Sequence, residues 1–296
     1  MITPLISVVM PVWNGEMYLA EALDSMLSQT LSGFELIIVD DGSSDATLQI
    51  LEKYARADSR IRIIRLSHEG IVVALNRGIA EAKSNWIARM DCDDVAHPER
   101  LEKQWRAVSR QRDIVLCHTN IELFGDPAFF PLKMQHMPRT ESMLRVRLCI
   151  HCPITHPTVL MRKEAFLSAG GYMPEERHAE DYGLWGRMLP LGRFIVIRAP
   201  LLKFRVHGGS ISKQAAENQS LLANKIRTSI SFNLFQRDGK RAESLLKGIS
   251  RQGTRPFTFG DSISLAKLLL RHGLLNAETT AWLGLNTLRA IRAPAT

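Results

Sequence analysis

Five aspartates follow two apolar runs, FELIIV and WIARM, in the first third of the chain. They are Asp40, Asp41, Asp91, Asp93 and Asp94. Crowded carboxylates repel one another unless a cation or hydrogen-bond donors compensate their charge. Their oxygens are hard ligands, which favour Mg²⁺ or Mn²⁺ over zinc. The spacing therefore indicates either a divalent cation site or polar turns that cap helices.

The turn interpretation stays open beside the cation site. Asp40 and Asp41 precede Gly-Ser-Ser, which is typical of a turn that caps a helix, and Asp94 is expected to be structural, capping towards Pro98. No GxxxxGK[ST] motif occurs and no GxGxxG follows the first apolar run, which argues against P-loop and dinucleotide sites. A metal held by one or two carboxylates could instead bind a diphosphate directly.

Strand and helix patterns alternate through the first half. Apolar runs predict strands at Leu5–Met10, Phe34–Val39, Ile61–Leu66 and Trp86–Met90. Helical spacing predicts helices at Gly15–Gln29, around Leu48–Ala55 and at Val72–Ala82. This alternation is typical of a mostly parallel sheet with helices on both faces, where ligands bind beyond the carboxyl ends of the strands. The aspartates are therefore expected to share one rim of the sheet.

The second half is less regular. It predicts strands at Ile114–Leu123, Phe194–Ile197 and Leu201–Val206 and helices at Arg162–Ala169 and Ala179–Leu189. The last of these helices carries Glu180 and Asp181. A CxxC pair, Cys149 and Cys152, could serve redox chemistry or zinc, but no second ligand pair stands at zinc spacing. We expect spare thiols there.

Composition is typical of a globular protein, with 296 residues and 45% hydrophobic content, enough for one large domain with an appendage. Four cysteines and no apolar signal segment predict a cytoplasmic protein. The segment Met1–His207 has 25 Lys and Arg against 25 Asp and Glu, whereas Gly208–Thr296 has 13 against 5. The tail therefore carries all of the excess positive charge.

This basic tail has three candidate roles. Leu and Ile recur at helical spacing in it, so its helices could lie on an anionic membrane surface. The same stripes could instead pack on the rest of the chain or on another subunit of a homo-oligomer. Nucleic-acid binding is not expected, because basic and aromatic residues do not interleave there.

Five motifs resemble those of the family 2 glycosyltransferases with the GT-A fold. They are SVVMPVWNGEMYLAEALDSMLSQT, ELIIVDDGSSDAT, ALNRGIAEAKSNWIARMDCDD, HPERL and EDYGLWGRM. The resemblance covers Leu5 to His207 in order. It implies an α/β GT-A fold, with a mostly parallel central sheet flanked by helices and a C-terminal helical extension. It places a catalytic domain at residues 1–212 and a basic helical region at 213–296.

The resemblance also implies a nucleotide-sugar site. Pro11 through Asn14 would meet the nucleotide base. Asp40 and Asp41 would bind base and ribose, with Asp41 as the stronger candidate for the base. Gly70 and Asn76 would lie beside the diphosphate. A UDP-sugar is the expected donor.

The remaining motifs supply the metal and the base by the same resemblance. Asp93 of the DxD motif would ligate Mn²⁺ or Mg²⁺, and Asp91 would contact the ribose or a metal-bound water. His207 would add a further metal ligand or a diphosphate contact, and Asp181 would be the catalytic base. On the acceptor side we expect His156, Glu180 and Trp185.

The implied activity is inverting transfer of a sugar to a glycan or lipid-linked acceptor, in cell-surface polysaccharide synthesis. The expected location is cytoplasmic, with a peripheral position at the inner face of the membrane left open. Two rivals remain. A nucleotidyltransferase is expected to have a glycine-rich basic first loop, but PVWNGEMYL has one glycine and no Lys or Arg. A non-catalytic binding module is expected to have lost the DxD motif or the base, and both are present.

Overall fold

The computed structural model describes residues 3–130, 138–208, 216–249 and 258–292. The chain divides into two compact units, described separately here. The first contains Met1–Gln135 and Ile154–Ala216, and the second contains His136–Pro153 and Glu217–Thr296. The boundary expected after residue 212 falls in 209–215, outside the described residues. The segment 136–153, which no sequence pattern separates from its neighbours, belongs to the helical second unit.

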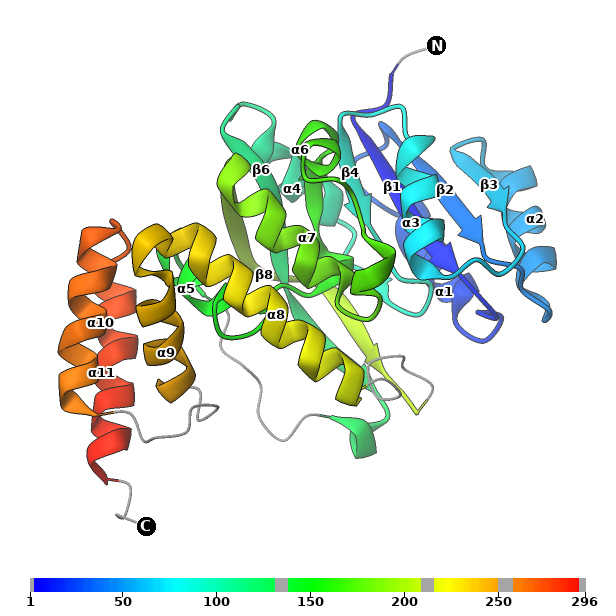
Figure 1. Ribbon diagram of the computed structural model, residues 1–296. Coiled ribbons are helices and arrows are strands. Elements are labelled where there is room, and N and C mark those ends of the chain that lie inside the picture. The colour runs from blue at the N-terminus through cyan, green and yellow to red at the C-terminus, as the bar shows by residue number, and fades with distance from the viewer. Residues whose placement is uncertain (1–2, 131–137, 209–215, 250–257, 293–296) are drawn as a thin grey trace. The chain divides into compact units, whose positions relative to one another are not determined.

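An eight-stranded sheet organises the first unit in the order β3-β2-β1-β4-β7-β6-β8-β5 (Figure 1). The strands are β1 (Ile6–Val12), β2 (Phe34–Asp40), β3 (Ile61–Arg65), β4 (Trp86–Arg89), β5 (Val95–Ala96), β6 (Ile114–Gly125), β7 (Leu160–Arg162) and β8 (Arg193–Val206). β1 to β4 pair in parallel, and β6 pairs in parallel with β8. β7 and β5 pair antiparallel with their neighbours. The expected α/β sheet is confirmed, and it is mixed in its second half.

Six α-helices of the described residues accompany this sheet. They are α1 (Leu19–Leu27), α2 (Thr47–Ala57), α3 (Ile71–Ala80), α4 (Arg100–Val108), α6 (Lys163–Ser168) and α7 (Glu180–Met188). Val8 and Met10 of β1 join one core cluster with buried residues of α1, α2 and α4. Val9 points the other way, where a Cβ built on Gly78 of α3 would lie 2.5 Å from its Cγ1. β1 is thus buried on both faces, as its unbroken apolar run predicts.

Strand β8 corrects one sequence expectation. The pattern predicts two strands, Phe194–Ile197 and Leu201–Val206, but the structure has one strand, Arg193–Val206. The ladder with β6 shifts register on both sides of the pair Asn120 and Pro200. Proline has no backbone N–H to donate to the ladder, which accounts for the irregularity. β8 continues past it and ends at Val206, one residue before His207.

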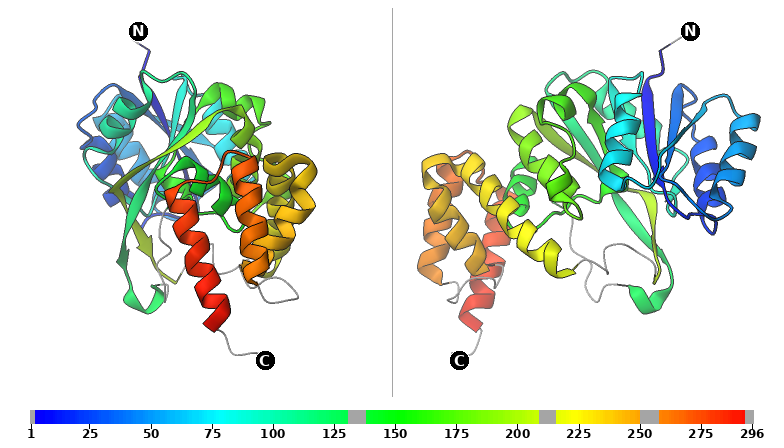
Figure 2. Two further views of the ribbon diagram at one scale, coloured as in Figure 1. Left: turned by 90° about the vertical axis from the view of Figure 1, so that its left-hand side faces the viewer. Right: turned by 45° about the vertical axis from the view of Figure 1, so that its right-hand side comes forward.

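The second unit is helical, with α5 (Glu141–Leu148), α8 (Ala216–Phe235), α9 (Gly239–Ile249), α10 (Phe259–Arg271) and α11 (Ala277–Arg292). Both oxygens of Glu278 on α11 bind the start of α5, accepting from Arg139 N (2.8 Å) and Thr140 N (2.8 Å). This acceptor satisfies backbone donors that a helix start leaves unpaired. α10 and α11 lie side by side in both views of Figure 2.

The leucines and isoleucines that recur at helical spacing in this unit differ in burial. Ile226, Ile230, Leu265, Leu268 and Leu269 are buried. Leu285 and Leu288 of α11 are instead more than half exposed, at 58% and 52%. The side chain of Ile291, the last residue of that stripe, lies outside the described residues. Within the described parts of the chain, no helix is both long and apolar enough to cross a bilayer.

Candidate active site

The first strand end is tied to the loop after the second. Val12 O accepts from Asp41 N (2.9 Å), because β1 and β2 end side by side. Asn14, at φ +50°, accepts from Ser44 N (2.8 Å) and donates its own backbone N–H to Ser43 Oγ (2.9 Å). Pro11 lies within β1, where it cannot donate to the ladder. The segment Pro11–Asn14 therefore forms a fixed edge of the rim.

Asp40 and Asp41 are both buried and both hold loops. Asp40 Oδ1 accepts from Ser43 N (3.1 Å). Asp41 Oδ1 and Oδ2 accept from the backbone N–H groups of Glu69 (2.7 Å) and Gly70 (2.8 Å). Gly70 caps α3 at φ +92°, in the left-handed region that favours glycine. Asp41 thus fixes the loop that starts α3 beside the second strand end.

An aromatic pair lies on the same rim. Trp13 is 53% exposed, and its ring lies 4.7 Å from that of His68, tilted by 34°. His68 Nδ1 is 3.3 Å from Asp41 O, which anchors the imidazole to the second strand end. Exposed aromatic faces offer flat surfaces on which a base can stack. The segment Pro11–Asn14 was predicted to meet the base, but the sequence did not single out the Trp13 side chain.

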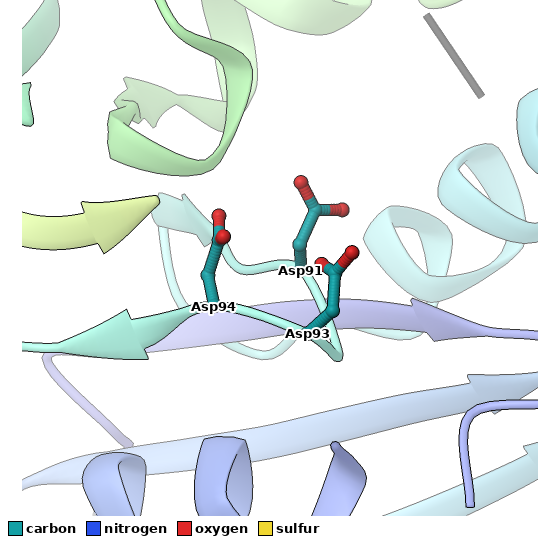
Figure 3. A group of neighbouring side chains, drawn as sticks. All are labelled: Asp91, Asp93 and Asp94. Atoms are coloured by element: carbon teal, nitrogen blue, oxygen red, sulfur yellow. The ribbon is translucent and has the colours of Figure 1, made fainter. Parts of the chain in front are cut away.

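The loop after β4 gathers three carboxylates, Asp91, Asp93 and Asp94, called here the acid cluster. One oxygen from each lies within 4.8 Å of the others. Figure 3 shows the three side chains projecting to one side of the loop. Asp94 is 1% exposed, and its Oδ2 has no hydrogen-bond partner among the described residues. The structural role expected for Asp94 stays a prediction, and its carboxylate also belongs to this cluster.

Cations and backbone donors from distant parts of the chain meet the acid cluster. The buried Arg89 forms an ion pair with Asp91. His207 Nε2 lies 3.0 Å from Asp93 Oδ2. Arg205 donates its N–H to Asp94 Oδ1 (2.8 Å) and its Nε–H to Asp93 O (2.7 Å). The end of β8 therefore closes over the DxD loop and brings His207 to the predicted metal residue.

Stacking and a second buried arginine hold this arrangement. The Arg205 guanidinium lies over the rings of Tyr18 (4.3 Å) and Phe124 (4.2 Å). Arg100 is fully buried and donates from Nη2 to Arg89 O (2.6 Å). Burial lowers the pKa of Arg100 to about 10, while the charges of Asp94 and Asp91 oppose that change. Both arginines place positive charge beside the acid cluster.

The acid cluster still holds excess negative charge. Burial, together with Asp91 and Asp93, raises the pKa of Asp94 to about 8. Burial also raises the pKa of Asp91, although Arg89 opposes it. Three hard oxygen donors with one unpaired oxygen fit a divalent cation of the Mg²⁺ or Mn²⁺ type.

The first turn of α7 carries a second pair of carboxylates. Glu180 is buried, and its Oε2 has no hydrogen-bond partner in the described part of the chain. Asp181 Oδ1 accepts from Tyr182 N (2.7 Å). Burial and the charge of Glu180 raise the pKa of Asp181 to about 7, with Arg89 opposing. An aspartate that titrates near neutral pH suits proton transfer.

Aromatic and amide groups lie beside this pair. His156 Nε2 is 2.7 Å from Tyr172 Oη, and the His156 ring packs edge-on against Trp185 at 5.8 Å. Trp185 is fully buried, and its Nε1 has no partner among the described residues. Asn76 donates to Tyr172 O (2.8 Å) and accepts from Tyr172 N (3.1 Å). The Asn76 amide therefore positions Tyr172, and its expected place beside a diphosphate stays a prediction.

Arg89 acts electrostatically on both the acid cluster and the carboxylate pair of α7. The charge of Arg89 acts on the pKa of Asp91 and on that of Asp181. Burial together with the charge of Arg89 also holds the pKa of His156 well below its ordinary value. The sequence did not point to Arg89, Arg205 or Tyr172. Arg89 stands in the motif RMDCDD two residues before its partner Asp91, but its burial depends on tertiary packing.

The CxxC cysteines lie at the end of α5 in the second unit. Cys149 and Cys152 are unbridged. Burial raises the pKa of the Cys149 thiol to about 12, so it stays protonated at neutral pH. A protonated, buried thiol is a poor nucleophile and a poor zinc ligand. The expectation of spare thiols stays a prediction for the pair.

Comparisons with known proteins identify the family. Residues 7–168 match the family described as Glycosyl transferase family 2. The O-antigen biosynthesis glycosyltransferase WbnJ of Escherichia coli is 34% identical over 220 residues, which cover 72% of this chain and 84% of that protein. The putative glycosyltransferase EpsE of Bacillus subtilis is 33% identical over 194 residues, covering 64% and 68%.

Solved structures show the same fold. S. aureus TarS 1–349 in complex with UDP-GlcNAc is 18% identical, with a TM-score of 0.67 over 97% of this chain and 89% of that one. The mannosyltransferase PcManGT from Pyrobaculum calidifontis, in complex with GDP-Man and Mn²⁺, is 15% identical, with a TM-score of 0.58 over 99% and 82%. At these identities the likeness concerns the fold. Together with the matched family, it makes this chain a family 2 glycosyltransferase with the GT-A fold.

Proposed function

We propose that the chain transfers a sugar from a nucleoside-diphosphate sugar to a hydroxyl of a glycan or lipid-linked saccharide, with inversion, in cell-surface polysaccharide synthesis. The acid cluster carries this proposal, because it sets three carboxylates and an unpaired oxygen beside a rim with an exposed aromatic pair. The role of WbnJ in O-antigen biosynthesis supports the polysaccharide context. The UDP-GlcNAc complex of TarS supports a UDP-sugar donor.

Mn²⁺ or Mg²⁺ would be held by Asp93 and Asp91, with His207 as a further ligand or a diphosphate contact. Asp94 offers an additional oxygen through its unpaired Oδ2. When bound, the ion would neutralise the charge that develops on the departing diphosphate. Arg205 positions these ligands, since its side chain donates to the backbone carbonyl of Asp93 and its own backbone N–H donates to the carboxylate of Asp94.

The donor would lie along the ends of β1 and β2. Its base would stack on Trp13 beside Asn14 and Pro11, and Asp40 and Asp41 would contact base and ribose. Both oxygens of Asp41 already accept backbone hydrogen bonds. Asp41 can therefore also act by fixing Gly70, whose loop would face the diphosphate.

Asp181 would take the proton from the acceptor hydroxyl as it attacks the anomeric carbon. Its pKa of about 7, raised by burial and by Glu180, leaves a substantial fraction of the carboxylate ionised at neutral pH and basic enough to accept that proton. Glu180, His156 and Trp185 would shape the acceptor side. Inversion follows from in-line attack, with the base and the diphosphate on opposite faces of the sugar.

The second unit would place the enzyme at a membrane. It carries 15 Lys and Arg against 6 Asp and Glu, and α11 exposes Leu285 and Leu288. Basic helices with exposed apolar residues bind anionic lipid surfaces. We therefore place the protein in the cytoplasm, peripheral at the inner face of the cell membrane. A catalytic domain at residues 1–212 would act there with its basic region at 213–296.

A thermal-shift screen of nucleoside diphosphates tests the donor class. The full chain is heated with UDP, GDP, ADP, CDP or dTDP, each in the presence of Mn²⁺ or of EDTA. We expect one base to stabilise the protein, and only with Mn²⁺, because a ligand that binds the folded state raises the melting temperature. No stabilisation by any nucleotide would contradict a nucleotide-sugar site. Equal stabilisation in EDTA would contradict the metal alone.

A further inference from the structure

Two arginines and a histidine gather at the end of α5 in the second unit. Arg147 lies in the last turn of this helix, and His151 follows three residues after its end. The two stay close because His151 N donates to Arg147 O (2.9 Å). Arg227 of α8 reaches the same place, where its Nη1 donates to Ile150 O (3.1 Å). Nothing in the proposed transfer reaction uses this cationic cluster.

The cationic cluster has unused hydrogen-bonding groups. Arg227 is 8% exposed, and its Nη2 donates to Asn224 Oδ1. Its buried Nε and the buried Nε2 of His151 have no hydrogen-bond partner among the described residues. A buried polar group without a partner destabilises a fold unless a ligand or water satisfies it.

One carboxylate that acts on this cluster, Glu278, also binds the start of α5. Glu278 is the group whose charge raises the pKa of Arg147 against the lowering by burial. Its oxygens accept hydrogen bonds from Arg139 N, Thr140 N and Thr140 Oγ1 at 2.7 to 2.8 Å. Glu278 is therefore committed to the start of α5, whereas the cationic cluster lies at its end.

The groups of the cluster repel one another in their charged forms. Burial, followed by the charges of Arg147 and Arg227, lowers the pKa of His151 to about 4. Both guanidinium groups therefore act on the imidazole. A bound anion would reverse this effect and supply acceptors for the unpaired nitrogens. Arg147 and His151 are partly exposed, so the cluster is open to solvent at these two side chains, while Nε of Arg227 and Nε2 of His151 are buried.

We propose that Arg147, His151 and Arg227 form a binding site for a phosphate group. Guanidinium groups match the geometry of phosphate oxygens and bind them with paired hydrogen bonds. The phosphate can belong to a soluble phosphate or diphosphate, or to the headgroup of an anionic lipid. The competing explanation is that Arg227 only caps the end of α5 through Ile150 O. This site lies in the second unit and stands or falls independently of the transfer reaction.

Calorimetric titration of the full chain with inorganic pyrophosphate tests the soluble source. EDTA and an Asp93→Ala background suppress metal-dependent binding at the acid cluster. We expect saturable binding that weakens at least tenfold in Arg147→Gln and in His151→Asn. Arg241→Gln is the matched control, because Arg241 is an exposed arginine of the same unit that contacts Ser264 Oγ at 3.3 Å. This variant should bind within twofold of the parent.

Vesicle flotation tests the lipid source with the same variants. If the site binds a lipid headgroup, Arg147→Gln and His151→Asn should lose at least fivefold more binding to phosphatidylglycerol vesicles than Arg241→Gln. None of the three variants should bind phosphatidylcholine vesicles. If the site binds a soluble phosphate, the calorimetric titration should give the pattern described for pyrophosphate. All variants should then bind to the vesicles equally. Circular dichroism and the melting temperature confirm that each variant folds. Arg227→Lys, which keeps the charge, replaces any variant that does not fold. Equal behaviour of all variants with both probes overturns the proposal and leaves only a helix cap.

Discussion

The first unit brings carboxylates together in two places, and the groups that contact them differ. In the acid cluster, Asp91 meets Arg89, Asp93 meets His207, and Asp94 accepts from the backbone of Arg205. At the start of α7, Glu180 has an oxygen without a partner among the described residues, and its charge acts on Asp181. Each carboxylate of the acid cluster meets a cation or a backbone donor, yet burial and the neighbouring carboxylates still raise the pKa of Asp94 to about 8, so a bound cation would be needed to keep the cluster ionised. In the α7 pair, burial and the charge of Glu180 raise the pKa of Asp181 to about 7.

This difference matches two chemical tasks. A group that holds a cation must stay ionised, so nearby positive charges and donors are an advantage. A general base must exchange a proton, so a pKa near neutrality is an advantage. Burial and Glu180 bring the pKa of Asp181 to about 7. The comparison therefore predicts that variants of the two groups fail in different ways.

Asp181→Asn should give the largest loss. The amide keeps the size of the side chain but cannot accept the proton, so kcat should fall about 10³-fold, within the range of general base catalysis. The dissociation constant of the nucleoside diphosphate should change less than twofold, because that ligand would bind on the other side of the site. Rapid-quench transfer assays and calorimetry measure the two quantities.

Chemical rescue offers a control for that variant. A small exogenous base such as azide or formate should restore part of the transfer by Asp181→Asn, since the rest of the site is intact. Asp113→Asn, at an exposed aspartate paired with Arg193, should behave like the parent. Transfer by Asp181→Asn at a parental rate would assign the base to another residue.

Asp93→Ala should fail earlier, at donor binding. The variant removes a carboxylate that faces His207, so Mn²⁺-dependent stabilisation by the nucleotide should disappear and kcat/KM should fall about 100-fold. Differential scanning fluorimetry with a Mn²⁺ titration measures the first effect. Unchanged Mn²⁺ dependence would move the metal to Asp91 and Asp94.

The sequence predicted the rim of the site well because strand ends are local features. Unbroken apolar runs located β1, β2 and β4, and the rule that ligands bind beyond the carboxyl ends of strands brought Asp41 and Asp91 to one edge. Strands β5 and β7 were missed, because two or three residues carry no readable alternation.

The compensating groups were harder to predict because their pairing is tertiary. Arg205 lies 112 residues after Asp93, whose backbone it binds. Arg89 and Arg100 are buried arginines, which sequence alone assigns to the surface. The sequence motifs therefore predict which carboxylates lie together, whereas only the structure shows which cations and donors contact them.

Trp13→Ala should give a moderate loss confined to the donor side. Removal of the exposed ring beside His68 should weaken nucleotide binding about tenfold, in line with the stacking of a base on one aromatic side chain. Trp13→Phe should retain most of the affinity, which separates stacking from folding. Equal affinity in Trp13→Ala would place the base away from this ring.

Glu180→Gln should give the smallest effect. It tests whether the charge of Glu180 raises the pKa of Asp181. The charge of Glu180 helps to raise the pKa of Asp181 to about 7, so the active, ionised form of Asp181 accumulates as pH rises through that value. In the parent, kcat should therefore rise with pH and level off above about 7. Removing the negative charge lowers the pKa of Asp181, so this rise should move to lower pH by up to about one unit. Since burial is the larger cause and remains, the shift should be partial, and the level above pH 8 should fall by less than tenfold. A pH profile that does not move would mean that Glu180 does not tune Asp181, and a loss of kcat of about 10³-fold at all pH values would show that Glu180 itself is the base.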